Sequence, residues 1–172
     1  MKKDKLAIFD IDGTIFRSSL IVELVEGLIK NNIFAKDLLN EIENDYANWT
    51  NRQGTYVDYI TKVVDVYIRN LKGVKEEDVR KVAQEVISYQ KDKLYVFTRD
   101  LIKKLKNENY YLLAISGSPE IIVSEFTNVL GFDKYYGTRF EVVDGVFTSK
   151  QLEETAWNKH EILTNFILKH PE

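Results

Sequence analysis

The segment LAIFDIDGT, residues 6–14, is the part of the sequence from which the architecture can be worked out. Its first four residues are apolar, and their short length and abrupt polar stop favour a strand buried on both faces. Asp12, Gly13 and Thr14 are then expected to form a loop, since these residue types are common where a chain turns. Asp10 and Asp12 therefore stand just beyond the carboxyl end of the predicted strand.

Helical periodicity follows this strand and continues to about residue 95. Ser18 or Ser19 is expected to cap the first helix of this block. The clearest apolar stripe falls at residues 56–71, and Gly73 stands where a left-handed residue would end that helix. The block contains no proline and little strand signal, so the sequence predicts a group of four helices inserted after the first strand.

Strands and helices alternate again in the second half of the chain. A helix capped by Thr98 is predicted before an apolar run at residues 110–115, which ends in Ser116-Gly117-Ser118. Pro119 suits the first turn of the next helix, for which Ser118 would be the cap. The remaining predicted elements are a helix closed by Gly131, a strand at 134–136, a hairpin around Asp144-Gly145 and a helix at 157–168.

Alternation of this kind is typical of a parallel sheet with right-handed crossovers. We therefore expect an α/β fold in which a Rossmann-like parallel sheet carries an inserted, all-helical cap. The sheet domain is discontinuous, with residues 1–16 and 96–172, and the cap comprises residues 17–95.

The composition excludes several classes of protein. A net charge of −3 with interspersed charges argues against a nucleic-acid binder that works by charge attraction. The chain has no cysteine, which excludes disulfides, thiolate nucleophiles and Cys-ligated zinc. No apolar run reaches membrane length, and the first one breaks at Asp10, so neither a membrane span nor a signal peptide is expected. The sequence predicts a soluble, cytoplasmic protein without nucleic-acid or membrane partners.

Two predicted strands end in polar residues that suit phosphate chemistry. In an open parallel sheet, ligands bind beyond the carboxyl ends of the strands, so Asp10, Asp12 and Ser116 are expected to share one crevice. Two acids two residues apart suit Mg²⁺, which binds few carboxylates and keeps water or substrate oxygens. An aspartate is also able to attack phosphorus, while Ser116 and the N–H of Gly117 offer donors to a phosphate oxygen.

These residues resemble those of the haloacid dehalogenase-like hydrolase superfamily. Residues 10–14 match its first motif, DxDGT, and the resemblance implies that Asp10 is the nucleophile while Asp12 is the general acid/base and offers its backbone carbonyl to the metal. Ser116 matches the second motif, and Lys159 resembles the lysine of the third, which steadies the charge of the nucleophile and phosphate. The position of the cap and the stretch at residues 139–148 resemble the phosphoserine-phosphatase-like branch.

The chain departs from that branch at two places. A fourth, acidic motif that supplies another metal ligand is expected several tens of residues after Lys159, but the sequence given stops at Glu172. The sheet domain is therefore expected to be C-terminally truncated, with residues 5–9 as an open edge. The hypothesis is either self-association through this edge or a natural gene product that is longer than the sequence given. In addition, Ser19 stands where phosphoserine phosphatases carry a glutamate that binds the substrate amine.

The function expected from these observations is Mg²⁺-dependent hydrolysis of a small phosphorylated metabolite through an aspartyl-phosphate intermediate. The alternative is a catalytically inactive relative that binds a partner through its cap, which the missing fourth motif favours. A receiver-type signalling domain fits poorly, because receivers lack a helical insert after the first strand. Arg17 and Arg52 are further candidates for contact with a phosphate or carboxylate, but nothing in the sequence singles them out.

Overall fold

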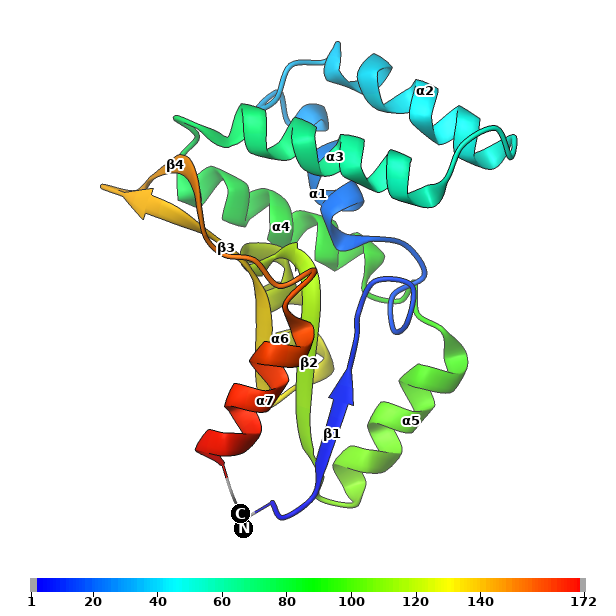
Figure 1. Ribbon diagram of the computed structural model, residues 1–172, viewed down its shortest axis with the longest axis vertical. Coiled ribbons are helices and arrows are strands. Elements are labelled where there is room, and N and C mark those ends of the chain that lie inside the picture. Colours follow the sequence, from blue (N-terminus) through cyan, green and yellow to red (C-terminus); the bar gives the residue numbers. More distant parts are fainter. Residues whose placement is uncertain (1–2, 171–172) are drawn as a thin grey trace.

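The computed structural model describes residues 3–170 and consists of a four-stranded sheet flanked by helices, with a group of helices at one end (Figure 1). The strands are β1 (Leu6–Phe9), β2 (Tyr111–Pro119), β3 (Lys134–Val143) and β4 (Val146–Glu153), in the spatial order β1-β2-β3-β4. The helices are α1 (Leu20–Lys30), α2 (Leu38–Thr50), α3 (Tyr56–Leu71), α4 (Glu76–Gln90), α5 (Val96–Asn107), α6 (Glu120–Leu130) and α7 (Lys159–Lys169). The predicted α/β class is confirmed.

Three strands of the sheet are parallel, as the alternation of elements predicts. Phe9 of β1 pairs with Ala114 of β2, and Ile115 of β2 pairs with Tyr136 of β3. Only β4 runs antiparallel, with β3 as its partner. The residues that follow Phe9 and Ile115 therefore emerge side by side at one end of the sheet.

The central strand β2 is buried on both faces because its side chains alternate between two apolar clusters. Leu112 and Ala114 pack into the main core on the side of α5 and α6. Leu113 and Ile115 face the other way and pack against Ile162 and other apolar residues of α7. The first residue of α7, Lys159, is thereby held close to the end of the sheet where β1 and β2 terminate (Figure 1).

Strand β1 differs from its prediction, since only one of its faces is covered. Phe9 packs into the main core, whereas Leu6 and Ile8 on the opposite face are 37% and 41% exposed. The helix α7 packs on β2 and does not reach across β1. Among the described residues, β1 pairs with β2 alone, so it forms an edge of the sheet as expected. Self-association through this edge stays a prediction.

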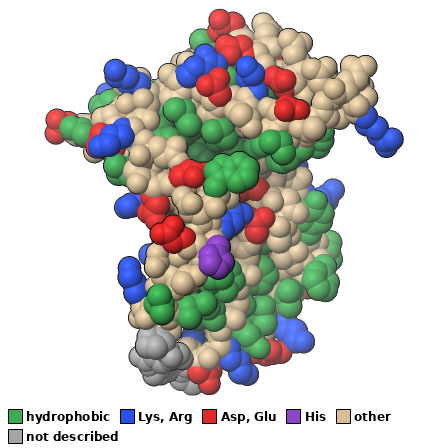
Figure 2. All heavy atoms as spheres, in the orientation of Figure 1, with side chains coloured by type: hydrophobic (Ala, Val, Ile, Leu, Met, Phe, Trp, Pro, Cys, Tyr) green, Lys and Arg blue, Asp and Glu red, His purple; other side chains and the backbone are tan. Residues whose placement is uncertain are grey.

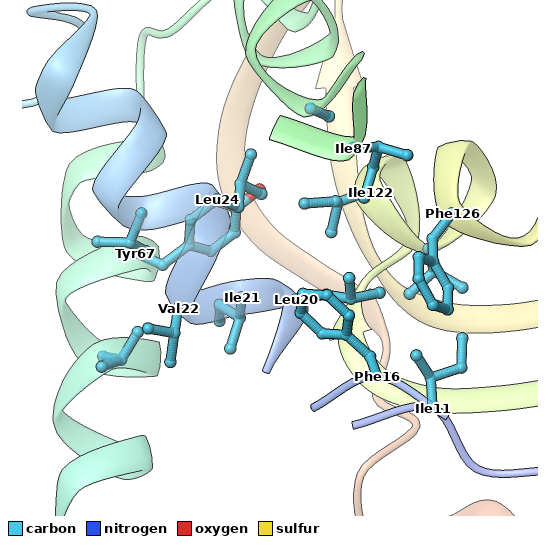
Figure 3. Packing of buried hydrophobic residues seen from close by; sticks show 14 of the residues in the cluster. Ile11, Phe16, Leu20, Ile21, Val22, Leu24, Tyr67, Ile87, Ile122 and Phe126 are labelled. Carbon is cyan, nitrogen blue, oxygen red and sulfur yellow. The ribbon is translucent and has the colours of Figure 1, made fainter. Parts of the chain in front are cut away.

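The helices α1 to α4 pack on one another and on the sheet domain without a gap in the apolar core. Phe16, which precedes α1, contacts Phe126 of α6 with 5.4 Å between the ring centroids (Figure 3). Gly27 lets α1 and α4 approach closely, because a Cβ atom there would lie 2.7 Å from Val86. The predicted boundaries of the cap stay a prediction, since one continuous cluster of buried residues spans both parts.

The hairpin of β3 and β4 ties the sheet to the cap. Asp144 and Gly145 both have positive φ angles, 50° and 77°, which is the backbone of the predicted two-residue turn. The β4 residue Phe147 exchanges backbone hydrogen bonds with Gly73 and Val74, in the loop between α3 and α4. The strand β3 is longer than predicted, because pairing with β4 extends it to Val143.

The caps predicted at Thr98 and Ser118 are wrong. Thr98 lies inside α5, which begins at Val96, and its hydroxyl donates instead to the carbonyl of Thr14. Ser118 does not cap α6, because β2 continues to Pro119 and the side chain of Ser118 is directed to another partner. No helix within residues 3–170 has both the length and the apolar character that crossing a bilayer requires.

Candidate active site

The turn after β1 orients both aspartates. The N–H groups of Thr14 and Phe16 bond to the carbonyl of Ile11, which folds residues 11–16 into a compact loop. Gly13 has a φ of 73°, a conformation that glycine adopts without strain. The glycine of the DIDGT segment is thus explained by the backbone of the turn.

Asp10 presents its carboxylate to a cavity while two neighbours hold it in place. Its Oδ1 accepts a hydrogen bond from Lys159 Nζ at 2.5 Å, and its Oδ2 accepts one from Thr14 Oγ1 at 2.9 Å. The side chain of Asp10 is 37% exposed, so the carboxylate remains accessible. The sequence predicted the place of Lys159 beside Asp10, whereas Thr14 was part of the motif without an assigned role.

The carboxylate of Asp12 points into the protein. Its Oδ2 accepts a hydrogen bond from Ser116 Oγ at 2.6 Å, and its Oδ1 accepts one from the N–H of Leu20 at 2.6 Å. Ser118 Oγ lies 3.1 Å from both oxygens and also accepts from the N–H of Ile21. Asp12 therefore caps α1, a role expected of Ser18 or Ser19.

Burial of the Asp12 carboxyl group raises its pKa above the ordinary value of 3.8. The hydrogen bonds from Ser116, Leu20 and Ser118 oppose this shift, and the nearby charge of Asp10 adds to it. A carboxyl group whose protonated form is favoured in this way suits a general acid.

Ser116 and Gly117 lie beside the two aspartates, at the end of β2. Ser116 is fully buried, and its hydroxyl accepts the N–H of Ser118 while it donates to Asp12. The carbonyl groups of Ser116 and Gly117 accept hydrogen bonds from Thr155 and Thr138, respectively. The buried Thr155 was not predicted, and nothing near it in the sequence marks it out, because its partners are 39 and 17 residues away.

A cavity of about 490 Å³ opens over these residues. Asp10, Asp12, Gly117, Ser118 and Lys159 line one end of it. The helix α3 and the β3–β4 hairpin line the other end. Figure 2 shows hydrophobic side chains gathered along the underside of the helical end of the molecule, facing its junction with the sheet. Of the five predicted site residues, Asp10, Asp12, Gly117 and Lys159 line this cavity. Ser116 is fully buried and does not line it, because its hydroxyl donates to Asp12 instead of facing the space where a phosphate would bind.

The sequence of this chain was compared with models of known protein families. The family model of the haloacid dehalogenase-like hydrolases matches residues 7–163. The chain belongs to this family. Among curated proteins, the chain is 28% identical over 148 residues to a phosphoserine phosphatase of Methanocaldococcus jannaschii and 22% identical over 149 residues to one of Archaeoglobus fulgidus. The match covers 86% and 87% of this chain, but only 61% and 38% of those two proteins.

Solved structures share the fold of this haloacid dehalogenase-like hydrolase. A phospho-aspartyl intermediate analogue of phosphoserine phosphatase superposes with a TM-score of 0.59 at 23% identity, covering 99% of this chain and 74% of that one. A protein of unknown function from Bordetella pertussis Tohama I has a TM-score of 0.71 at 13% identity, with 94% and 72% covered. At these identities the comparison establishes the architecture alone.

Two oxygens of the protein are placed where they fit a divalent metal. The Asp10 carboxylate is accessible, and the carbonyl of Asp12 is left open because the N–H groups of residues 13–16 bond to Ile11, Phe16 or Ser18. The Asp12 carboxylate is already used by donors within the protein. No cluster of three or more His, Cys, Asp or Glu side chains able to hold a metal occurs in residues 3–170. Two protein oxygens suit Mg²⁺, which completes its octahedron with water and substrate.

Replacing Gly117 with alanine is expected to destabilise the protein by moving the segment that leads to Lys159. A Cβ atom at position 117 would lie 3.0 Å from the Cβ of Ala156 and 3.3 Å from its Cα, closer than ordinary contact. We expect the free energy of unfolding to fall by about 1–2 kcal/mol, measured by urea denaturation. A combined Gly117→Ala/Ala156→Gly variant removes the contacting methyl and is expected to recover most of the loss; no recovery would contradict this explanation.

Proposed function

We propose that this chain hydrolyses phosphate monoesters through an aspartyl-phosphate formed on Asp10. The observation that carries the proposal is the state of Asp10: its carboxylate is open to a cavity, yet Lys159 and Thr14 fix its orientation. A fixed and accessible carboxylate at the end of a parallel sheet is suited to in-line attack on a bound phosphate.

In the first step, the Asp10 carboxylate attacks phosphorus and the bond between phosphorus and the ester oxygen breaks. Asp12 gives its proton to the departing oxygen, so an alcohol leaves and Asp12 becomes ionised. The raised pKa of Asp12 supports its role as proton donor. Lys159 and the N–H of Gly117 would stabilise the negative charge on the transferred phosphoryl group.

In the second step, a water molecule attacks the phosphorus of the aspartyl-phosphate. Asp12 accepts a proton from this water, the acyl-phosphate bond breaks, and inorganic phosphate and the Asp10 carboxylate result. Asp12 returns to its protonated form, so the two steps close a cycle. In the structure the hydroxyl groups of Ser116 and Ser118 hold the Asp12 carboxylate turned into the protein, so both proton transfers require this side chain to rotate towards the cavity.

Mg²⁺ would be held by the Asp10 carboxylate and the Asp12 carbonyl oxygen, and it would offset the repulsion between the nucleophile and the phosphate. With two protein ligands we expect weak binding, in the millimolar range typical of loosely held sites. A small phosphorylated metabolite and a cytoplasmic location are part of this proposal.

The purified chain is expected to release phosphate from p-nitrophenyl phosphate in the presence of Mg²⁺. Addition of excess EDTA should reduce the rate by at least about tenfold, and added Mg²⁺ should restore it. The measurement is p-nitrophenolate absorbance at fixed pH. A rate that does not depend on Mg²⁺ would contradict the metal part of the proposal. Absence of turnover at millimolar Mg²⁺ would contradict hydrolysis by this chain and favour the alternative, a domain that binds without catalysis.

A further inference from the structure

The wall of the cavity above the aspartates is largely apolar. Helix α3 contributes one face of this wall and β3 contributes a second. Its apolar members, from α1, α3, the end of β2 and β3, are Ile21, Ile60, Val64, Ile68, Pro119 and Phe140. A surface of this kind binds a ligand by removing its apolar area from water, and it offers little to a charged group.

Among the described residues, few of the side chains that line the cavity are charged, and most of these are acidic. The charged residues that line the cavity are Asp10, Asp12, Glu154 and Lys159, and the single cation among them is already paired with Asp10 at 2.5 Å. Arg17 lines a different hollow, beside α1 and α2, rather than this cavity. A carboxylate on the leaving group would therefore meet acids without a free cation, which costs free energy in a partly enclosed site.

The residue at position 19 supports the same conclusion, that the cavity has no site for a charged leaving group. Ser19 is buried and lines the cavity, and it offers a ligand only a neutral hydroxyl. The neighbouring acid of the same helix, Glu23, is directed away from the cavity to Lys93 and Gln90. An amino-acid leaving group thus finds no charged partner on α1. Glu154 is the lining acid outside the catalytic end that its ammonium could meet, but its carboxylate meets no unpaired cation among the described lining residues.

Aromatic side chains flank the cavity. Trp157, in the segment before α7, lines it while being 83% exposed, and Tyr56 at the start of α3 lines it too. Tyr67 of α3 also lines it, and its hydroxyl is a buried polar atom without a partner among the described residues. Exposed aromatic rings at the mouth of a pocket favour a flat apolar ligand.

We infer that the substrate is a phosphate monoester of an uncharged, mainly apolar alcohol or phenol rather than of an amino acid. This inference rests on the proposed function, because it describes the leaving-group side of the same site. A cavity of about 490 Å³ has room for a ring-sized leaving group in addition to the phosphate.

The test compares non-hydrolysable phosphonates that differ in the group attached to phosphorus. Benzylphosphonate has an apolar ring, 2-amino-4-phosphonobutanoate imitates phosphoserine, and 3-aminopropylphosphonate has a cationic amine. Dissociation constants are measured by calorimetry with Mg²⁺ present. We expect benzylphosphonate to bind at least about tenfold more tightly than either of the others. Equal affinities, the reverse order, or no binding of benzylphosphonate at 10 mM would overturn the inference.

This comparison separates the inference from the proposed function, because phosphonate binding requires no turnover. Preference for benzylphosphonate by a chain that hydrolyses no ester would support the inference about the cavity and contradict the proposed reaction. Efficient hydrolysis together with tighter binding of the phosphoserine analogue would support the proposed reaction and contradict the inference about the cavity.

A pair of matched variants locates the preference in the cavity wall. Val64 is half-buried and lines the cavity, whereas Val129 of α6 is exposed and lines none of the described hollows. Val64→Asp is expected to weaken benzylphosphonate binding at least about tenfold and orthophosphate binding by less, whereas Val129→Asp should change neither. If circular dichroism shows that Val64→Asp does not fold, Val64→Thr, which keeps the shape of the side chain, is used instead. It should also weaken benzylphosphonate binding more than orthophosphate binding, but by a smaller factor. Equal weakening of both ligands would contradict a role in leaving-group recognition.

Discussion

Asparagine in place of Asp10 is expected to lower kcat by at least about 1,000-fold, because an amide does not attack phosphorus. The reaction would lose its covalent intermediate, and none of the neighbours of Asp10 is able to replace it: Lys159 is a cation and Thr14 is a neutral donor. Turnover is measured with p-nitrophenyl phosphate and Mg²⁺. In addition, acid quenching with a ³²P-labelled substrate should trap phosphate on the unaltered chain and not on the variant.

The fold of the Asp10→Asn variant should remain intact. The ion pair that it loses is more than one-third exposed on both sides, so the free energy of unfolding is expected to change by less than about 1 kcal/mol. Asp65→Asn is a matched control, since Asp65 pairs with Arg69 at 2.9 Å in a somewhat more exposed place and does not line the cavity. The control should keep full activity. Full activity in Asp10→Asn itself would remove the proposed mechanism.

The segment at residues 6–14 allowed much of the site to be predicted, because its structure depends on local interactions. The strand, the turn with Gly13 and the positions of both aspartates follow from residues within a few positions of one another. The placement of Ser116 beside Asp12 also follows, since the carboxyl ends of neighbouring parallel strands meet at one edge. Lys159 was predicted from a resemblance, and packing of α7 on β2 accounts for its position.

The parts that were missed depend on contacts between distant segments. Ser118 alternates in orientation with Gly117 along the extended end of β2, which brings its hydroxyl to Asp12 rather than to the N-terminus of α6. Asp12 caps α1 because the loop returns the start of that helix over its carboxylate. The exposed face of β1 was also missed, because an apolar run does not reveal which of its faces a helix covers. Propensity describes neighbours in sequence, and these features are decided by neighbours in space.

Replacing Asp12 with asparagine is expected to separate the two steps of the reaction. Loss of the general acid should lower kcat/KM for alkyl phosphates by about 100-fold or more. p-Nitrophenolate leaves without a proton, so the first step with p-nitrophenyl phosphate should be affected far less. The second step still lacks its base, so the variant should release one equivalent of p-nitrophenolate in a burst and then stall as the aspartyl-phosphate. Rapid-mixing absorbance measures this burst, and equal losses for both substrates without a burst would contradict the role of Asp12.

The same variant should change how stability depends on pH. Because burial raises the pKa of Asp12, the folded protein binds its proton more tightly than the unfolded chain does. This contribution to stability is fully present below pH 3.8 and is lost as the pH rises through the folded-state pKa. Asp12→Asn has no carboxyl group to titrate and does not lose this stability. The melting temperature of the variant minus that of the unaltered chain should therefore increase between pH 4.5 and pH 7.5. Asp58 is the control, because its hydrogen bonds to Thr55 lower its pKa, and the effect of Asp58→Asn should therefore be constant over the same range. A flat difference for Asp12→Asn would show that the buried carboxyl group does not retain its proton more strongly than an exposed one.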